Sequence, residues 1–67
     1  MASRSEQREK TRAAIVQAAL NLSADKGFPA LSLREVTREA GVAPATFYRY
    51  FVDMEELGLA IVDEVGL

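Results

Sequence analysis

The chain has 67 residues, a formal net charge of −2, and neither cysteine nor histidine. Its length allows one small domain with a limited core. Its composition excludes disulfides, zinc sites with thiolate or imidazole ligands, and catalytic centres built on cysteine or histidine. Residues 1–50 hold all eight basic residues and five of the ten acids, while residues 51–67 hold the other five acids. We therefore expect any polyanionic partner to meet the first fifty residues.

No apolar run is long enough for a membrane span or a cleaved signal peptide. We expect a cytoplasmic protein without membrane contact, metal or cofactor. Serine, threonine and tyrosine are present, but no base or oriented acid is spaced to activate them, so we expect no enzyme.

The first residues are polar and basic, which predicts a flexible arm over residues 1–8 that runs into a helix. From about Glu6 to Lys26, apolar residues recur at helical spacing. The buried face expected for this first helix consists of Ile15, Ala18, Ala19 and Leu22. Gly27 is its expected end, because glycine adopts positive φ without a Cβ clash.

A second helix of about two turns is predicted by Ser32 and Glu35, which match the S-x-x-E capping box. Gly41 supplies the end of this helix. Its expected inner face consists of Leu33, Val36, Thr37 and Ala40. Arg34 and Arg38 lie outside that face, and we expect Arg34 to contact a partner and Arg38 to be solvated.

A third helix is predicted from Pro44, a favoured first helical residue, to about Phe51. At ~100° per residue, Phe47 and Phe51 share one side with Pro44, so we expect the two phenylalanines in the core. The other side presents Ala45, Thr46, Arg49 and Tyr50, with Tyr48 at the border.

Asp53 and Glu56 predict the capped start of a fourth helix. Its expected apolar face consists of Met54, Leu57, Ile61 and Val65. The predicted fold is all-α: a three-helix helix-turn-helix DNA-binding domain over residues 9–52, plus the start of a fourth helix over residues 53–67. Helical geometry alone is equally compatible with a structural bundle.

The exposed face of the third helix suits a DNA duplex. Ala45 and Thr46 are small enough to let the backbone approach base edges in the major groove, where their methyl groups can contact thymine. Tyr48, Arg49 and Tyr50 can donate to phosphate oxygens.

Ser32 and Arg34 would face the opposite wall of the groove, where a capping hydroxyl and nearby amides can hold a phosphate. The alternatives are that the tyrosines are packing residues at a rim, and that Arg34 and Arg38 balance neighbouring glutamates on a solvated face.

The run from Ala19 to Leu57 resembles the DNA-binding domain of the TetR family of transcriptional repressors. The resemblance is carried by Gly27-Phe28, Gly41-Val42, Phe47-Tyr48-x-x-Phe51 and Glu56-Leu57. It implies a homodimeric repressor of palindromic operators, with residues 53–67 leading to an absent C-terminal domain for dimerisation and binding of a small-molecule effector. The DNA contacts that it implies are Ser32, Arg34, Pro44, Ala45, Thr46, Tyr48, Arg49 and Tyr50.

The segments LSLREV-x-REAG, FYR-x-F-x-D-x-EELG and VDE-x-GL are most similar to regulators of unsaturated fatty-acid synthesis, which respond to acyl-CoA or acyl-carrier protein. Two residues depart from the family pattern. Met54 replaces a lysine that contacts phosphate, and Ala43 replaces a serine that caps the third helix. The alternative function is a helical protein-interaction module, suggested by apolar residues of the fourth helix.

Overall fold

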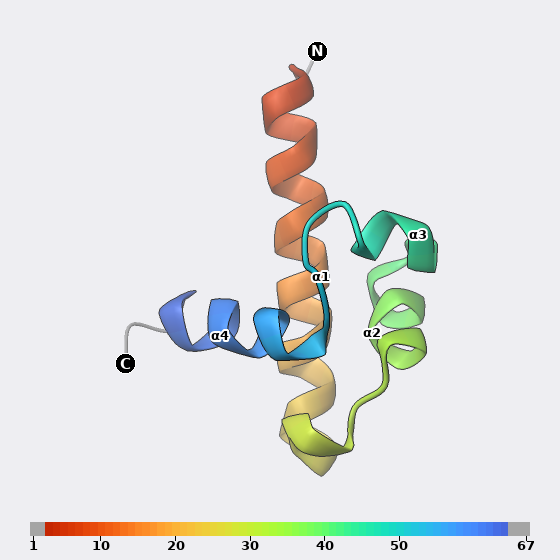
Figure 1. Ribbon diagram of the computed structural model, residues 1–67, viewed down its shortest axis with the longest axis vertical. Coiled ribbons are helices and arrows are strands. Elements are labelled where there is room, and N and C mark those ends of the chain that lie inside the picture. The colour runs from red at the N-terminus through yellow and green to blue at the C-terminus, as the bar shows by residue number, and fades with distance from the viewer. Residues whose placement is uncertain (1–2, 65–67) are drawn as a thin grey trace.

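The computed structural model describes residues 3–64, which form an all-helical structure without strands (Figure 1). The elements are α1 (Arg4–Lys26), the 3-10 helix η1 (Phe28–Ala30), α2 (Leu33–Ala40), α3 (Pro44–Phe47) and α4 (Met54–Glu64). The predicted all-α fold is confirmed. Val65 of the predicted apolar face lies outside the described residues. Among the described helices, none has the length and apolarity needed to cross a membrane.

The long helix α1 is the element around which the other helices are arranged. α2 packs against α1 on one side and α3 packs against α2, while α4 contacts α1 from another side. Figure 1 shows the N-terminal half of α1 extending beyond the other helices. This part of α1 therefore stands beside the rest of the fold instead of inside it.

α1 begins earlier than the sequence pattern predicted. Residues 4–8, which we expected in a flexible arm, belong to the helix, because the Ser3 hydroxyl caps it by accepting from the Glu6 N–H at 3.2 Å. The negative charge of Glu6 in the first turn also favours helix formation. The predicted end is confirmed: Gly27 has φ 79°, and its N–H donates to the Ser23 carbonyl at 2.9 Å.

Both predicted ends of α2 are present. The Ser32 hydroxyl accepts from the Glu35 N–H at 3.2 Å, and the Glu35 carboxylate accepts from the Ser32 N–H at 3.2 Å, which completes the capping box. At the other end, Gly41 is left-handed, with φ 75° and ψ 30°. The N–H groups of Gly41 and Val42 donate back to carbonyls of the last turn, as in a Schellman motif. This sharp end turns the chain directly into α3.

α3 is shorter than the predicted helix to Phe51, since its regular part spans only Pro44–Phe47. Beyond it, the N–H groups of Arg49 and Tyr50 donate to the carbonyls three residues earlier, at 3.1 and 3.0 Å. Such bonds tighten the last turn of a helix. The Phe51 N–H still donates to the Phe47 carbonyl at 3.0 Å, so the chain keeps coiling and the two phenylalanines remain on one side.

The core draws residues from all four α-helices and from the segment between α3 and α4. Its buried apolar residues are Ile15, Val16, Ala18, Ala19, Val36, Phe47, Phe51 and Leu57. Phe47 and Phe51 are 0% and 3% exposed, which confirms their predicted core position. The remaining described residues of the predicted inner faces are buried or half-buried. The core thereby fixes α3 from beneath and leaves its other side free.

Candidate nucleic-acid interface

Phe47 and Phe51 anchor α3 and the following turn to the core, and the opposite surface of this segment faces outward. Pro44, Ala45 and Arg49 are exposed, whereas Thr46 and Tyr50 are half-buried. Pro44 is therefore a surface residue, although the helical projection placed it with the phenylalanines. The small residues lie at the start of α3, where a backbone can approach another molecule closely.

The two tyrosines differ in their surroundings. Tyr48, predicted at the border, is 61% exposed, and its ring meets Phe47 edge-on with the centroids 5.6 Å apart. Tyr50 packs partly against the hydrophobic core. The rim-packing alternative therefore holds in part for Tyr50, while most of Tyr48 is open to a partner.

The start of α2 presents Ser32 and Arg34, both exposed. The Ser32 oxygen is occupied as an acceptor by the capping bond, but its O–H remains a donor. Behind it, Lys26 forms an ion pair with Glu35, and this hydrogen bond holds the pKa of the Glu35 carboxyl below its ordinary value. The ion pair offsets the negative charge closest to the capping hydroxyl, which makes this helix end more favourable for an anion.

A basic groove of about 980 Å³ lies between the N-terminal half of α1 and the segment that begins with α3. The α1 side contributes Arg4, Arg8 and Arg12, and the other side contributes Arg49. Thr46 and Tyr50 also line this groove, whereas the other five predicted contact residues do not. Three of the predicted residues thus meet a basic surface that the sequence did not assign to the site.

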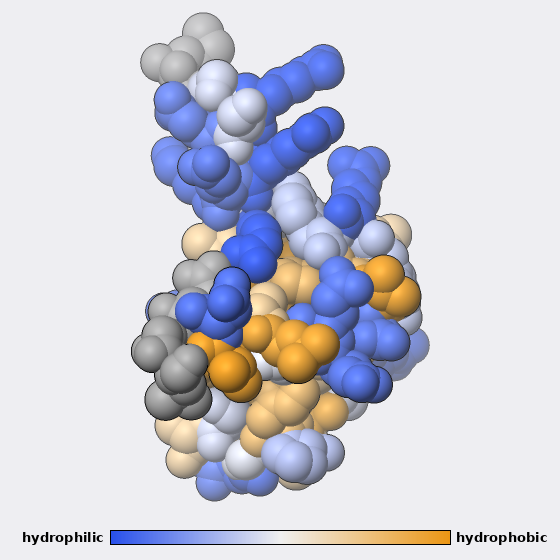
Figure 2. Space-filling model, turned by 60° about the vertical axis from the view of Figure 1, so that its left-hand side comes forward, coloured by the Kyte–Doolittle hydropathy of each residue, from blue (hydrophilic) through white to orange (hydrophobic). Residues whose placement is uncertain are grey.

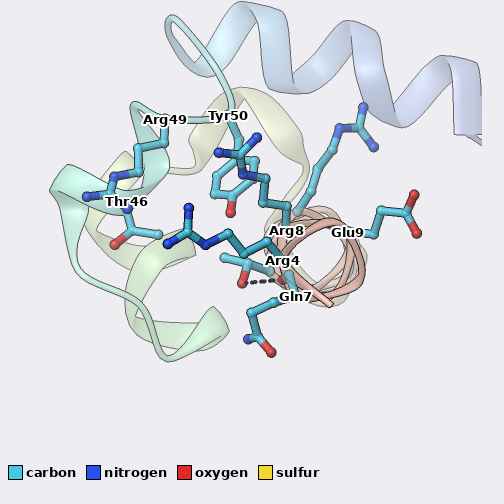
Figure 3. A pocket seen from close by; sticks show the side chains of 9 residues that line it. Arg4, Gln7, Arg8, Glu9, Thr46, Arg49 and Tyr50 are labelled. Atoms are coloured by element: carbon cyan, nitrogen blue, oxygen red, sulfur yellow. Dashed lines mark hydrogen bonds between the residues drawn. The ribbon is translucent and has the colours of Figure 1, made fainter. Parts of the chain in front are cut away.

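Figure 3 shows how the side chains lie in the basic groove. Arg4 and Arg8 reach from α1 toward the side that carries Thr46 and Arg49, with Tyr50 between the two sides. Glu9, the acidic residue of the lining, points away from Thr46 on the other side of α1. The groove therefore combines the positive charge of its arginines with the hydroxyl groups of Thr46 and Tyr50.

Arg12 is the third arginine of α1 that lines the basic groove, after Arg4 and Arg8. Its guanidinium lies over the Phe51 ring, 5.4 Å from the ring centroid, a distance that allows a cation–π interaction. This contact ties α1 to the segment that follows α3. Arg12 is therefore partly a packing residue, whereas Arg4 and Arg8 are exposed along their helix.

The sequence-based prediction missed Arg4 and Arg8 because it placed them in a flexible arm. Their spacing carried a usable signal: residues four apart share one face of a helix, and Arg4, Arg8 and Arg12 follow that spacing. The signal depended on extending the helix to residue 4, which in turn depended on recognising Ser3 as a cap.

The sequence of this chain is similar to those of bacterial regulators. Residues 15–61 match the family model described as "Bacterial regulatory proteins, tetR family". A curated protein of Haemophilus influenzae, named "Uncharacterized HTH-type transcriptional regulator", is 66% identical over 65 residues, which cover 96% of this chain and 32% of that protein. The chain thus spans about a third of the length of this relative. All eight predicted contact residues fall inside the matched segment, whereas Arg4 and Arg8 precede it.

Proposed function

Because the chain belongs to the TetR family of bacterial regulatory proteins, we propose that it binds operator DNA as part of a homodimeric transcriptional repressor. The observation that carries this proposal is the exposed face of α3, which is anchored to the core by Phe47 and Phe51. A rigid helix with small residues at its start is the form in which a helix-turn-helix protein enters the major groove.

Base recognition falls to the start of α3. Ala45 and Thr46 carry methyl groups that suit thymine, and the Thr46 hydroxyl can bond a base edge or a phosphate. Exposed Pro44 precedes them as the first residue of α3, where its missing N–H leaves no donor unpaired. We assign sequence preference to these residues.

Phosphate contacts fall to the residues around α3 and at the start of α2. Arg49 and Tyr48 are exposed donors, and Tyr50 lines the basic groove beside Arg49. Ser32 and Arg34 supply a hydroxyl and a guanidinium at the start of α2. Such contacts set the position of the protein on the duplex without distinguishing sequences.

This chain spans about a third of the length of the relative. In this proposal, dimerisation and effector binding belong to a further domain of a longer protein. Hydrophobic side chains gather along α4 (Figure 2), where Leu59 is 66% and Val62 is 48% exposed. These side chains suit burial against a further domain. Two half-sites a helical turn apart, ~34 Å, then give the dimer its avidity.

The regulated genes are proposed to be those of unsaturated fatty-acid synthesis, with acyl-CoA or acyl-carrier protein as the effector. The support is the likeness of LSLREV-x-REAG and FYR-x-F-x-D-x-EELG to such regulators; the segment VDE-x-GL runs beyond the described residues. Operator affinity should then change when acyl-CoA is added to the full-length chain. Equal affinity with and without acyl species would remove this assignment.

A protein-interaction module is the second candidate function, favoured by the exposed apolar residues of α4. It predicts a protein partner whose binding depends little on salt, because burial of apolar area drives it. DNA binding instead weakens steeply as salt rises. Failure to bind DNA at low salt would favour this second candidate.

Selection of bound sequences from random DNA, with the full-length chain, tests the proposed function. We expect recovery of a palindrome whose half-sites lie about one helical turn apart. The recovered half-site should contain a thymine whose replacement lowers affinity. Selection that recovers no common sequence would contradict operator recognition.

A further inference from the structure

The basic groove has a form that the face of α3 alone does not explain. Arg4 and Arg8 on α1 oppose Arg49 across an open space, and Thr46 and Tyr50 lie within it. Phosphate contacts from α3 would require only one of these walls. On the second wall, Arg4 and Arg8 are exposed and are not among the residues that pack in the core.

We infer that this groove holds one sugar–phosphate strand of the operator, so that α1 and α3 grip that strand from opposite sides. The inference rests on the proposed function. Only if α3 enters the major groove does the DNA strand at the edge of that groove come close to α1. Arg49 approaches the strand from the α3 side, and Arg4 and Arg8 approach it from the α1 side. The α1 arginines are then additional DNA-binding residues.

The spacing of the α1 arginines allows them to reach different phosphates of one strand. Residues four apart rise ~6 Å along an α-helix, and one strand of a duplex presents a phosphate about every 3.4 Å of its axis. Arg4 and Arg8 can therefore reach different phosphates of the same strand. Each guanidinium can form paired hydrogen bonds with phosphate oxygens.

The charge and chemistry of the groove favour a polyanion. Four arginines line it, and its acidic residue, Glu9, points away from Thr46. Thr46 and Tyr50 add hydroxyl groups that can donate to phosphate oxygens. A groove that is partly open to solvent suits a strand that passes through it better than a small molecule, which proteins usually enclose.

The inferred contacts of the α1 arginines are to phosphates. These arginines precede residues 15–61, the segment that matches the family model, and they are placed by the helix that Ser3 caps. A contact to phosphates carries no base information. Arg4 and Arg8 should therefore raise the affinity for every DNA sequence by the same factor.

The test compares salt dependence of DNA binding among variants of the full-length chain. The variants are Arg4→Ala, Arg8→Ala and their combination, with Lys10→Ala as the control. Lys10 lies on the same helix, is exposed, and does not line the groove. Affinity is measured over a range of salt on a selected operator and on random DNA, and helix content and thermal unfolding show whether each variant is folded.

Log affinity falls linearly as log salt rises. We expect the substitution Arg4→Ala or Arg8→Ala to make this slope shallower by ~0.9, and the double variant to make it shallower by about twice that amount. Affinity should fall on operator and random DNA alike, and Arg8→Lys should keep most of the slope, because lysine retains the charge. Lys10→Ala should leave the slope close to that of the wild type. Hydroxyl-radical footprinting should show one strand losing protection in the double variant.

Two results overturn the inference and leave the proposed function intact. In the first, the folded Arg4 and Arg8 variants match Lys10→Ala while Arg49→Ala loses affinity. In the second, the double variant loses binding only on the operator. Absence of DNA binding by the wild-type chain at low salt would instead contradict the proposed function itself.

Discussion

Phe47 and Tyr48 are neighbours in the chain, yet one side chain is 0% and the other 61% exposed. This step in exposure follows from the helical turn, which directs adjacent side chains ~100° apart. The same turn separates Thr46, which lines the basic groove, from Ala45, which does not. Single substitutions in this stretch should therefore have different effects: some on the core, some on phosphate contact and some on base preference.

Thr46 tests base preference most directly. Thr46→Ser keeps the hydroxyl and removes the Cγ2 methyl group, whereas Thr46→Ala removes both the hydroxyl and the Cγ2 methyl group. We expect either change to alter the ratio of operator to random affinity by ~5- to 10-fold, equivalent to about 1 kcal/mol. Competition binding at fixed salt measures this ratio. An unchanged ratio in both variants would remove Thr46 from the base-reading residues.

Ser32 combines a structural role with a proposed phosphate contact, and these can be separated. Ser32→Ala should lower the free energy of unfolding by about 1 kcal/mol through loss of the cap and should also weaken binding to operator and random DNA. Asp53→Ala is the matched control, because Asp53 caps α4 by accepting from the Glu56 N–H at 2.9 Å. It should cost similar stability and leave DNA affinity nearly unchanged, as chemical denaturation and gel shifts would show. Equal loss of affinity in the two variants would contradict the phosphate contact.

At the scale of elements, the corner between α1 and α2 is held by the ion pair of Lys26 with Glu35. The hydrogen bond to Lys26 lowers the pKa of Glu35 from its ordinary 4.5. A carboxyl whose pKa is lower when folded stabilises the fold above its unfolded pKa and loses this effect as pH falls through the folded value. The corner should therefore weaken in acid, below pH 4.5.

Glu35→Gln tests this pH dependence while keeping the corner otherwise intact, since glutamine also fits the third position of a capping box. We expect the variant to lose less stability than the wild type on acidification from neutral pH. Denaturant midpoints across that range measure the difference. Glu39→Gln, on the exposed side of the same helix, is the control. Its denaturant midpoint should fall on acidification by as much as that of the wild type. Identical acid profiles for Glu35→Gln and the wild type would refute the role of the ion pair.

The contact between η1 and α4 depends on the absence of a side chain at Gly58. A Cβ there would lie 3.0 Å from Phe28 Cε1 and 3.3 Å from Cζ. Alanine is favoured over glycine inside a helix by about 1 kcal/mol, but here the Phe28 ring opposes that gain. We expect Gly58→Ala to stabilise the protein clearly only in a Phe28→Leu background. A double-mutant cycle by thermal unfolding measures the coupling, and equal effects in both backgrounds would contradict the contact.

The element boundaries that were predictable from sequence are those set by local chemistry. Gly27, Gly41 and the capping box of Ser32 with Glu35 act within one turn, so a short stretch of sequence specifies them. The end of α3 was not predictable in this way. It ends at Phe47 in the structure because the following turn tightens, while the buried Phe51 keeps its predicted place.

At the scale of the whole molecule, the basic groove could not be predicted because it is formed by residues far apart in the chain. Arg8 and Arg49 belong to one surface only after the core has placed α1 beside α3. The eight contact residues predicted from motif and resemblance lie in one continuous stretch from Ser32 to Tyr50. A prediction based on that stretch had no means of finding its second wall.

The division of charge along the chain also acts at this scale. The basic residues belong to residues 1–50, whereas α4 carries acids and its apolar side chains. A duplex should therefore be attracted to the surface of α1 and α3 and repelled from α4. In the proposed homodimer, each half-site would engage one such surface, and tight binding would require both subunits.

The most direct test is the salt dependence of DNA binding by the full-length chain, compared with Arg49→Ala and with the solvated control Arg38→Ala. The account predicts that the log of wild-type affinity falls steeply and linearly as log salt rises. The slope should be shallower by ~0.9 for Arg49→Ala and close to that of the wild type for Arg38→Ala. Absence of wild-type binding at low salt, or equal slopes for all three proteins, would contradict it.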